Sequence, residues 1–220
     1  MTTALILGAT GLVGGELLDQ LLDNPAYERV VVVTRRPTGK SHPKLDEQIF
    51  ELGDMEKHAD VFAVQRIFCA LGTTIGKAGS QERFRIIDHD YALLAAKLGR
   101  SRGARHFLVV SALGASSRSS VFYNRVKGEL EDALRSLVYP SLTIARPSLL
   151  LGSRDEFRFG ESFAKVFAWL LPPRWRGIRA RHVARALIEL AREETRGARV
   201  VESKELRKIA KKAENSDPRG

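Results

Sequence analysis

Short apolar runs alternate with helix-like stretches along most of the chain. The apolar runs predict strands at residues 4–7, 30–33, 48–51, 66–70, 107–110, 142–145 and 199–202. Apolar residues spaced three or four apart predict helices at residues 12–22, 83–100, 122–137, 161–170 and 182–192. Because strands that alternate with helices form parallel sheets covered on both faces, we expect an α/β fold with a doubly wound parallel sheet.

A length of 220 residues is within reach of one domain with a substantial core. We expect residues 1–214 to form this single domain and residues 215–220 to form a flexible tail. The strand and helix alternation weakens after Gly152, where the chain carries a set of aromatic residues, Phe157, Phe159, Phe163, Phe167 and Trp169. We predict that residues 153–180 form a small substrate or lid segment, and core packing, a subunit contact or a membrane-surface helix are the alternatives.

The formal charge of +10 is concentrated near the C-terminus: residues 153–220 carry 17 basic and 10 acidic residues, whereas residues 1–152 carry 19 and 16. Nucleic-acid binding usually combines basic residues with aromatic ones, and the basic stretch from Lys204 to Lys212 contains no aromatic residue. We therefore do not expect a nucleic-acid partner, and interpret the stretch as a solvated helix or tail.

Cysteine and histidine are scarce in the sequence. The single cysteine, Cys69, excludes an internal disulfide, and the five histidines show no spacing typical of metal ligands, so we expect no metal. The N-terminal Met1-Thr2-Thr3 lacks the basic lead of a signal peptide, and no apolar run approaches the roughly 18 residues that span a bilayer. These features predict a cytoplasmic protein without a membrane partner.

The first predicted strand leads directly into a glycine-rich turn and then a helix. This is the context that a dinucleotide-binding loop requires. Gly8 permits a tight turn, Gly11 lets the backbone approach a pyrophosphate, and Gly14 lets the helix pack closely on the strand. The turn and the first helical turn predict a Rossmann-type nucleotide site formed by Gly8, Thr10, Gly11, Leu12, Val13 and Gly14.

The second strand ends at Thr34-Arg35-Arg36, where an acidic residue would select NAD. A guanidinium accepts a 2′-phosphate, whereas a carboxylate repels it, so Arg35 and Arg36 favour NADP(H) over NAD(H). The alternative is that both arginines are surface charges. Asp54, after the third strand, is a candidate contact of the adenine, with an exposed loop acid as the alternative.

A second glycine-containing stretch follows the fourth strand. It departs from a phosphate-binding P-loop, because Leu71 occupies the place of the first glycine and Ala78 the place of the magnesium-binding Ser or Thr. We interpret it as the loop leaving the fourth strand. Leu71, Gly72 and Thr73 then become candidate cofactor contacts on the nicotinamide side.

Tyr123 and Lys127 are four residues apart in a predicted helix, so their side chains project from one face. A lysine ammonium near a phenol favours the phenolate, which lets the phenol exchange a proton with a carbonyl or hydroxyl near neutral pH. Ser111 ends the preceding strand at the edge where ligands of open sheets bind, and its hydroxyl is a candidate holder of the substrate oxygen. A tyrosine and lysine pair on a solvated helix is the alternative.

The Gly8–Gly14 turn, Ser111 and Tyr123-x-x-x-Lys127 together resemble the extended or atypical short-chain dehydrogenase/reductase family. Residues 69–79 and 84–91 are similar to the HIV Tat-interacting, oxidoreductase-like branch of that family. The resemblance implies NADPH binding, with Tyr123 as acid/base, Lys127 on the nicotinamide ribose and Ser111 orienting the reacting oxygen.

The resemblance extends to the motif after the sixth strand, where Arg146 and Pro147 are similar to a family motif beside the pocket and join the cofactor candidates. Asp88 departs from the family, because many relatives have an asparagine at this point in the helix after the fourth strand. A carboxylate there is at odds with the usual water relay.

These observations predict an NADP(H)-dependent oxidoreductase that acts on a small carbonyl or alcohol substrate, with hydride transfer by the cofactor. Two alternatives remain: a nucleotide-sugar epimerase-like enzyme that retains its cofactor, and an NADPH-sensing regulatory protein without turnover. The sequence leaves the substrate open, as well as a protein partner or a homodimer.

Overall fold

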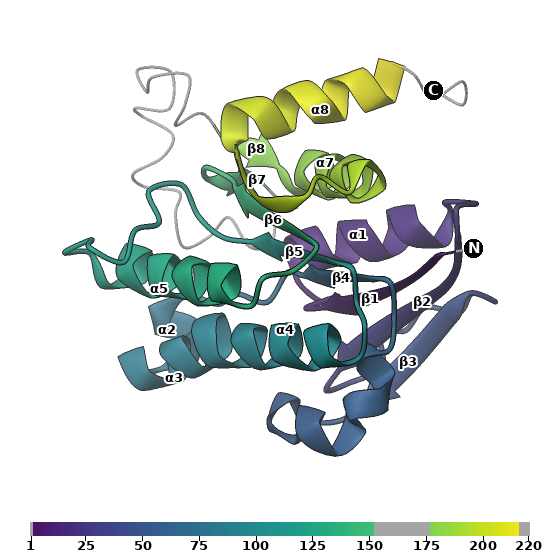
Figure 1. The fold of residues 1–220 in the computed structure, drawn as a ribbon, viewed down its shortest axis with the longest axis horizontal. Helices are drawn as coiled ribbons and strands as arrows, with labels where there is room; N and C mark the ends of the chain where they lie inside the picture. The colour runs from purple at the N-terminus through teal and green to yellow at the C-terminus, as the bar shows by residue number, and fades with distance from the viewer. Residues whose placement is uncertain (1, 152–176, 216–220) are drawn as a thin grey trace.

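The computed structural model describes residues 2–151 and 177–215. Within them, seven strands form one parallel sheet in the order β3-β2-β1-β4-β5-β6-β9 (Figure 1). The strands are β1 Thr2–Leu7, β2 Tyr27–Thr34, β3 Leu45–Ile49, β4 Arg66–Cys69, β5 His106–Val110, β6 Ser141–Arg146 and β9 Gly197–Glu202. The strand order reverses at β1, which pairs with β2 on one side and β4 on the other, and ligands of open α/β sheets bind at such a switch point. The predicted Rossmann-type doubly wound fold is confirmed.

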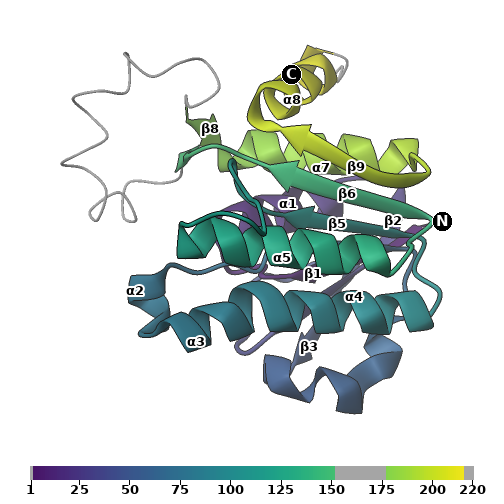
Figure 2. The ribbon, with the colours of Figure 1, turned by 60° about the vertical axis from the view of Figure 1, so that its left-hand side comes forward.

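Helices cover both faces of the sheet (Figures 1 and 2). One face carries α1 Leu12–Leu22 and α7 Ala180–Glu193, with α8 Ser203–Asn215 packed on α7. The other face carries the 3-10 helix η1 Leu52–Phe62, α4 Tyr91–Ser101 and α5 Phe122–Ser136. Three short elements precede α4, namely α2 Ile75–Ala78, α3 Gln81–Arg85 and the π-helical turn η2 Ile86–Asp90.

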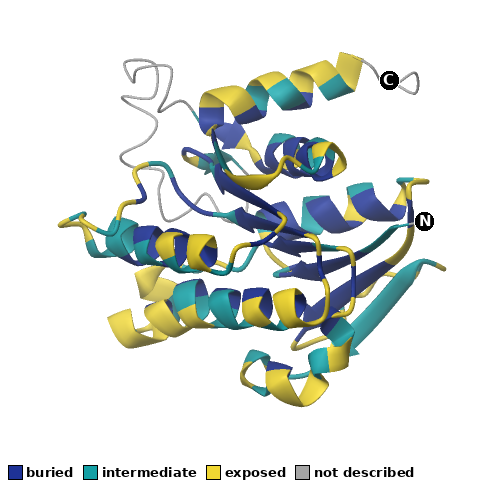
Figure 3. Ribbon diagram, in the orientation of Figure 1, coloured by how far each residue is buried: buried dark blue, intermediate teal, exposed yellow. Residues whose placement is uncertain are grey.

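Alternation along the strands divides the core into two layers. Leu5 and Leu7 face the layer of η1 and α4, whereas Ala4 and Ile6 face the layer of α1 and α7. All four are fully buried, and the exposed residues gather on the outer sides of the helices (Figure 3). Strands buried on both faces explain why the sequence shows near-continuous apolar runs in β1 and β2.

The third strand and the longest predicted helix differ from the prediction. β3 occupies residues 45–49 rather than 48–51, because this edge strand is polar and half-buried and lacks an apolar run. Its Asp46 accepts a 2.9 Å hydrogen bond from Arg29 of β2. The helix predicted at residues 83–100 begins at Gln81, where the Ser80 hydroxyl accepts the Arg83 N–H, and it is interrupted by η2.

The C-terminal part of the chain also differs from the prediction. The helix predicted at residues 161–170 and the aromatic set of the lid segment lie outside the described residues. Leu150–Leu151 (β7) and Ile178–Arg179 (β8), which flank that segment, pair as a small two-stranded sheet. The basic stretch is a helix, and Asn215, predicted to begin the tail, is the last residue of α8. Among the described residues, no helix is long and apolar enough to cross a membrane.

Candidate functional site

The glycine turn joins the carboxyl end of β1 to α1. Gly8 has a φ of +85°, a left-handed conformation that glycine adopts without strain. The Gly11 N–H donates to the Gly8 carbonyl at 3.0 Å, and Gly11 is the N-cap of α1. Gly11 supplies no side-chain cap, so among the described residues the first amides of α1 are open to an anion.

Contacts around the turn explain the glycine spacing. A Cβ at Gly14 would lie 1.9 Å from the Gly8 carbonyl oxygen, so only glycine lets α1 approach the turn. A Cβ at Gly11 would have the same oxygen as its nearest neighbour at 3.4 Å, so the outer side of Gly11 is open. The turn therefore forms a cradle of the kind that a dinucleotide pyrophosphate requires.

Arg35 and Arg36 lie in the turn that follows β2, and both are exposed. The Thr34 hydroxyl holds this turn by donating to the Arg36 carbonyl at 2.8 Å. Neither arginine has an acidic partner among the described residues, so both guanidinium groups can meet a phosphate. Asp54 lies at the start of η1, where its 2.6 Å bond with Lys57 holds the pKa of the Asp54 carboxyl below its ordinary value.

The loop after β4 runs beside the glycine turn. A Cβ at Gly8 would lie 2.5 Å from the Ala70 carbonyl oxygen, so the two backbones are in close contact. Leu71, Gly72 and Thr73 continue from this point toward α2. The Thr73 N–H donates to Asp88 at 2.9 Å, which fixes the loop to η2.

The predicted catalytic pair lies at the start of α5. Lys127 is 3% exposed, and its Nζ atom lies 2.7 Å from Oδ1 of the equally buried Asp88. Burial lowers the pKa of Lys127, but the charges of Asp88 and Tyr123 raise it by more, and the net pKa lies above the ordinary value. Lys127 is therefore a buried cation next to Tyr123.

Tyr123 is half-buried, and its ring packs against Phe84 with the centroids 5.5 Å apart. Within residues 2–151 and 177–215, its hydroxyl makes no hydrogen bond. The structure thus brings Tyr123 and Lys127 together and leaves the phenol hydroxyl available to a ligand.

Ser111 lies in a different environment from the one expected. Its hydroxyl, in a residue that is 4% exposed, donates to Glu131 Oε1 at 2.6 Å. Glu131 is fully buried and also accepts hydrogen bonds from Arg146, at 2.9 Å to one oxygen and 2.5 Å to the other. Ser111 therefore anchors an ion pair between α5 and the end of β6, instead of presenting a free hydroxyl. Pro147, next in the chain, accepts a bond from the Leu113 N–H.

Two acidic residues of this region, Asp88 and Glu131, were not among the predicted site residues. Glu131 is four residues after Lys127, which is four after Tyr123, so the three side chains share one helical stripe. The four-residue spacing is visible in the sequence and could have identified Glu131 as a neighbour of the predicted site. The partner of Asp88 is on another element, so the sequence marked Asp88 only as a departure from the family and not as the partner of Lys127.

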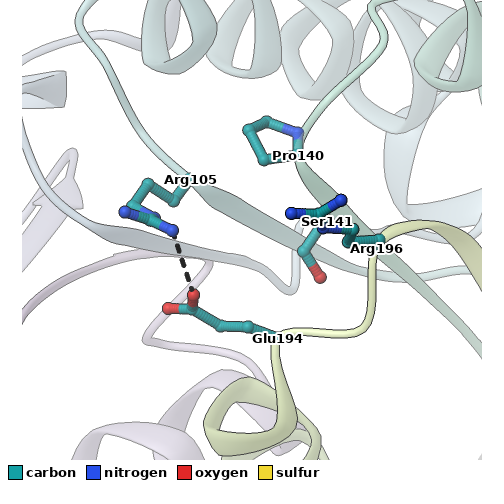
Figure 4. Close-up of a pocket in the computed structure, with 5 residues that line it drawn as sticks. All are labelled: Arg105, Pro140, Ser141, Glu194 and Arg196. Atoms are coloured by element: carbon teal, nitrogen blue, oxygen red, sulfur yellow. Dashed lines mark ion pairs between the residues drawn. The ribbon is translucent and has the colours of Figure 1, made fainter.

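The open clefts lined by described residues include the following two. One has a volume of about 370 Å³ and lies between the amino ends of β5, β6 and β9, at the sheet edge opposite to the glycine turn (Figure 4). Its lining residues are Arg105, Pro140, Ser141, Glu194 and Arg196, and Arg105 lies 3.7 Å from Glu194. The other, of about 430 Å³, lies between the start of α1 and the β8 to α7 junction. Within the described chain no group of three or more acidic, histidine or cysteine side chains is placed to hold a metal.

Comparison with known proteins identifies the family. Residues 3–88 match the family described as "Semialdehyde dehydrogenase, NAD binding domain". The chain is 34% identical to "Protein HTATIP2" of Rattus norvegicus over 174 residues, which are 77% of this chain and 72% of the relative. It is 32% identical to "Protein FMP52, mitochondrial" of Eremothecium gossypii over 218 residues, 94% of this chain and 97% of the relative. The chain belongs to the HTATIP2/FMP52 family.

The HTATIP2/FMP52 proteins are NAD(P)-binding proteins of the atypical short-chain dehydrogenase/reductase type, which confirms the resemblance seen in the sequence. Solved structures agree on the fold. The UDP-glucose 4-epimerase of Thermotoga maritima, solved with UDP-glucose, has a TM-score of 0.69 at 19% identity and covers 96% of this chain and 82% of its own. The domain is thus a pyridine-nucleotide-binding domain of the dehydrogenase and epimerase type.

The comparison overturns one expectation. Several fungal members of the HTATIP2/FMP52 family carry the word mitochondrial in their names. The cytoplasmic location predicted from the first residues is therefore wrong. The physical reason is that a basic lead at the N-terminus identifies secretory signals, and its absence says nothing of other organelles.

Proposed function

We propose that this protein is an NADP(H)-dependent oxidoreductase in which Tyr123 exchanges a proton with a substrate carbonyl or alcohol oxygen. The observation that carries the proposal is the buried Lys127 ammonium beside Tyr123, at the start of α5. A positive charge there favours the phenolate that remains when Tyr123 has given its proton away. The phenol hydroxyl has no competing hydrogen bond among the described residues.

The cofactor residues follow the carboxyl edge of the sheet. The turn from Gly8 to Gly14 would hold the pyrophosphate, with Thr10, Leu12 and Val13 contributing backbone. Arg35 and Arg36 would bind the 2′-phosphate, which is the basis for NADP(H) over NAD(H). The groups nearer the reacting end would be Leu71, Gly72, Thr73, Lys127, Arg146 and Pro147, with Asp54 on the adenine side. When bound, the nicotinamide supplies or accepts the hydride.

In the direction of reduction, Tyr123 donates its proton to the carbonyl oxygen and is reprotonated from solvent. Lys127 stabilises the intervening phenolate and would contact the ribose. Ser111 would hold the substrate oxygen only by giving up its 2.6 Å bond to Glu131. We therefore assign proton transfer to Tyr123 and Lys127 and give Ser111 the role of anchoring Glu131.

The test is the substitution Tyr123→Phe, which removes only a hydroxyl. Reduction of an accepted carbonyl should fall by about 10²–10⁴-fold, the range for lost acid/base catalysis, while NADPH affinity stays nearly constant. Stopped-flow NADPH oxidation against a panel of aldehydes, ketones and quinones measures the first quantity. Cofactor fluorescence measures the second.

Tyr91→Phe is the matched control, because Tyr91 is a half-buried tyrosine on α4, away from Lys127. It should leave turnover unchanged. An active wild type whose Tyr123→Phe variant turns over at the same rate would remove the acid/base assignment. A wild type that binds NADPH but reduces no member of the panel would favour the NADPH-sensing alternative.

A further inference from the structure

The π-helical turn η2 is the most unusual piece of backbone near the site. It spans Ile86–Asp90 between α3 and α4 and is followed without a break by α4. Such turns are rare and often occur at functional sites, because the extra residue re-aims a side chain. Ile86 and Asp90 at its ends are exposed, and the central Asp88 is 1% exposed.

The Asp88 carboxylate joins three elements that are far apart in the chain. One oxygen lies 2.7 Å from the Lys127 ammonium of α5, and the other accepts the Thr73 N–H at 2.9 Å. Thr73 belongs to the loop after β4, which contacts the glycine turn through Ala70. The Asp88 side chain therefore holds both the loop after β4 and α5, the helix that carries Tyr123 and Lys127.

Burying two charges in this way has a high desolvation cost unless each has a partner of good geometry. Lys127 and Asp88 are each other's partner, and both are almost completely inaccessible. An isolated buried lysine would instead tend to lose its proton. The charge of Lys127, on which the proposed function depends, is thus maintained by Asp88.

We propose that Asp88 is a positioning residue that holds the Lys127 side chain beside Tyr123 and keeps it protonated. The inference rests on the proposed role of Tyr123. Many relatives have an uncharged asparagine at this place. Here the Asp88 carboxylate forms a direct ion pair with Lys127.

The surroundings of Lys127 define what its charge can act on. The titratable groups that act on it are Asp88 of η2, Tyr123 of α5 and Cys69 of β4. Burial raises the pKa of the Cys69 thiol to about 11, so this group is neutral at physiological pH. Asp88 is therefore the group that maintains the Lys127 charge, and removing the Asp88 charge lets the buried lysine lose its proton more readily.

The test is Asp88→Asn in the cofactor-free protein, read by the near-ultraviolet absorbance of phenolate during an alkaline titration. The chain has only four tyrosines, and subtracting the titration of a Tyr123→Phe variant of each background isolates the signal of Tyr123. The Tyr123 signal should develop at a pH about one unit higher than in the wild type, the size expected when a nearby positive charge is lost. The pH profile of turnover should shift in the same direction.

Asp90→Asn is the matched control, since Asp90 is on the same turn, is exposed and pairs with His89. It should leave both the titration and the pH profile unchanged. An Asp88→Asn variant that is less stable but titrates like the wild type would overturn the inference and reduce Asp88 to a structural role. Because the titration needs no turnover, that result is distinct from failure of the proposed function.

If Asp88→Asn does not fold, the double variant Asp88→Asn/Lys127→Gln provides the second test, because it removes both buried charges together. The inference expects its Tyr123 signal to develop about one pH unit above that of the wild type, as in Asp88→Asn, since the phenol loses the Lys127 charge in both variants. A signal that develops at the wild-type pH would contradict it.

Discussion

The two edges of the same strands bury different kinds of polar group. At the carboxyl edge the buried groups are charged and paired, Lys127 with Asp88 and Glu131 with Arg146. At the amino edge they are uncharged near neutral pH: His106 Nε2 lies 2.8 Å from the Thr143 hydroxyl, and the Ser141 hydroxyl has no hydrogen-bond partner in the described part of the chain. The cleft in Figure 4 also lies at the amino edge.

The difference shows why the amino-edge cleft of Figure 4 is a poor guide to function. The carboxyl edge carries the glycine turn, the arginines after β2 and the paired charges of α5, as expected for ligand binding at the switch point of an open sheet. The amino edge has a cleft but lacks these features. Substitutions at the carboxyl edge are therefore expected to weaken cofactor binding, and substitutions at the amino edge are expected to leave it unchanged.

The largest effect is expected at the glycine turn, which depends on the absence of a side chain. Gly14→Ala would place a Cβ 1.9 Å from the Gly8 carbonyl, a contact between backbone atoms that no rotamer relieves. The free energy of unfolding should fall by about 3 kcal/mol, at the upper end for overpacking, with loss of cofactor binding. Urea unfolding measures the first effect and calorimetry the second.

Gly15→Ala is the neighbouring control. Its Cβ would meet only the Ala9 carbonyl, at 3.5 Å, and alanine has the higher helix propensity. Equal stability of the two variants would show that the close approach of α1 to the turn does not limit the fold.

The second effect concerns the amino edge. Burial, with a contribution from the positive charge of Arg66, lowers the pKa of His106 to about 4, compared with about 6.5 in the unfolded chain. Between these values the unfolded state binds more protons, so stability falls as the pH drops below 6.5. The loss should reach about 3 kcal/mol near pH 4.

Urea unfolding between pH 7 and pH 4 checks this dependence. His106→Gln removes the titrating group and should flatten the curve, although the variant is less stable at neutral pH through its altered contact with Thr143. A variant that keeps the wild-type slope would assign the acid sensitivity to other groups.

The smallest effect compares two arginine pairs. Arg35→Ala with Arg36→Ala at the carboxyl edge should weaken NADPH binding by about 1–3 kcal/mol, the range for charge-assisted hydrogen bonds, and change NADH binding little. Arg105→Ala with Arg196→Ala, in the amino-edge cleft, should change neither. Calorimetric titration of each double variant with NADPH and with NADH measures the change in affinity. An equal loss of affinity for the two cofactors would reject the role of Arg35 and Arg36 in binding the 2′-phosphate.

Much of the fold was predictable because its signals are local. Apolar runs located β1, β2 and β4, and the glycine turn with its following helix located α1 to the residue. β3 was misplaced because an edge strand needs no apolar run. The π-turn was missed because one extra residue in a turn leaves no break in the broad apolar face predicted for residues 83–100.

The parts of the candidate site that lie within one segment could be predicted from the sequence. The contacts between side chains of two segments could not. The spacing of Tyr123 and Lys127 within one helix was visible. The pairing of Lys127 with Asp88 and of Ser111 with Glu131 arises only when η2, α5 and β5 come together. A single sequence records neither contact.

The strand order also has a consequence for how the protein is made. Once β1, β2 and β3 exist, β4 pairs with β1, and β5, β6 and β9 then join in the order of synthesis, each on the outer side of the strand before it in the sheet. The packing of α1 does not follow this order, because its buried Leu17 and Leu21 belong to the same core layer as Val183 and Leu187 of the much later α7. A ribosome must release nearly the whole chain before α7 covers this helix, so the nascent protein carries an apolar surface that chaperones can bind during most of its synthesis.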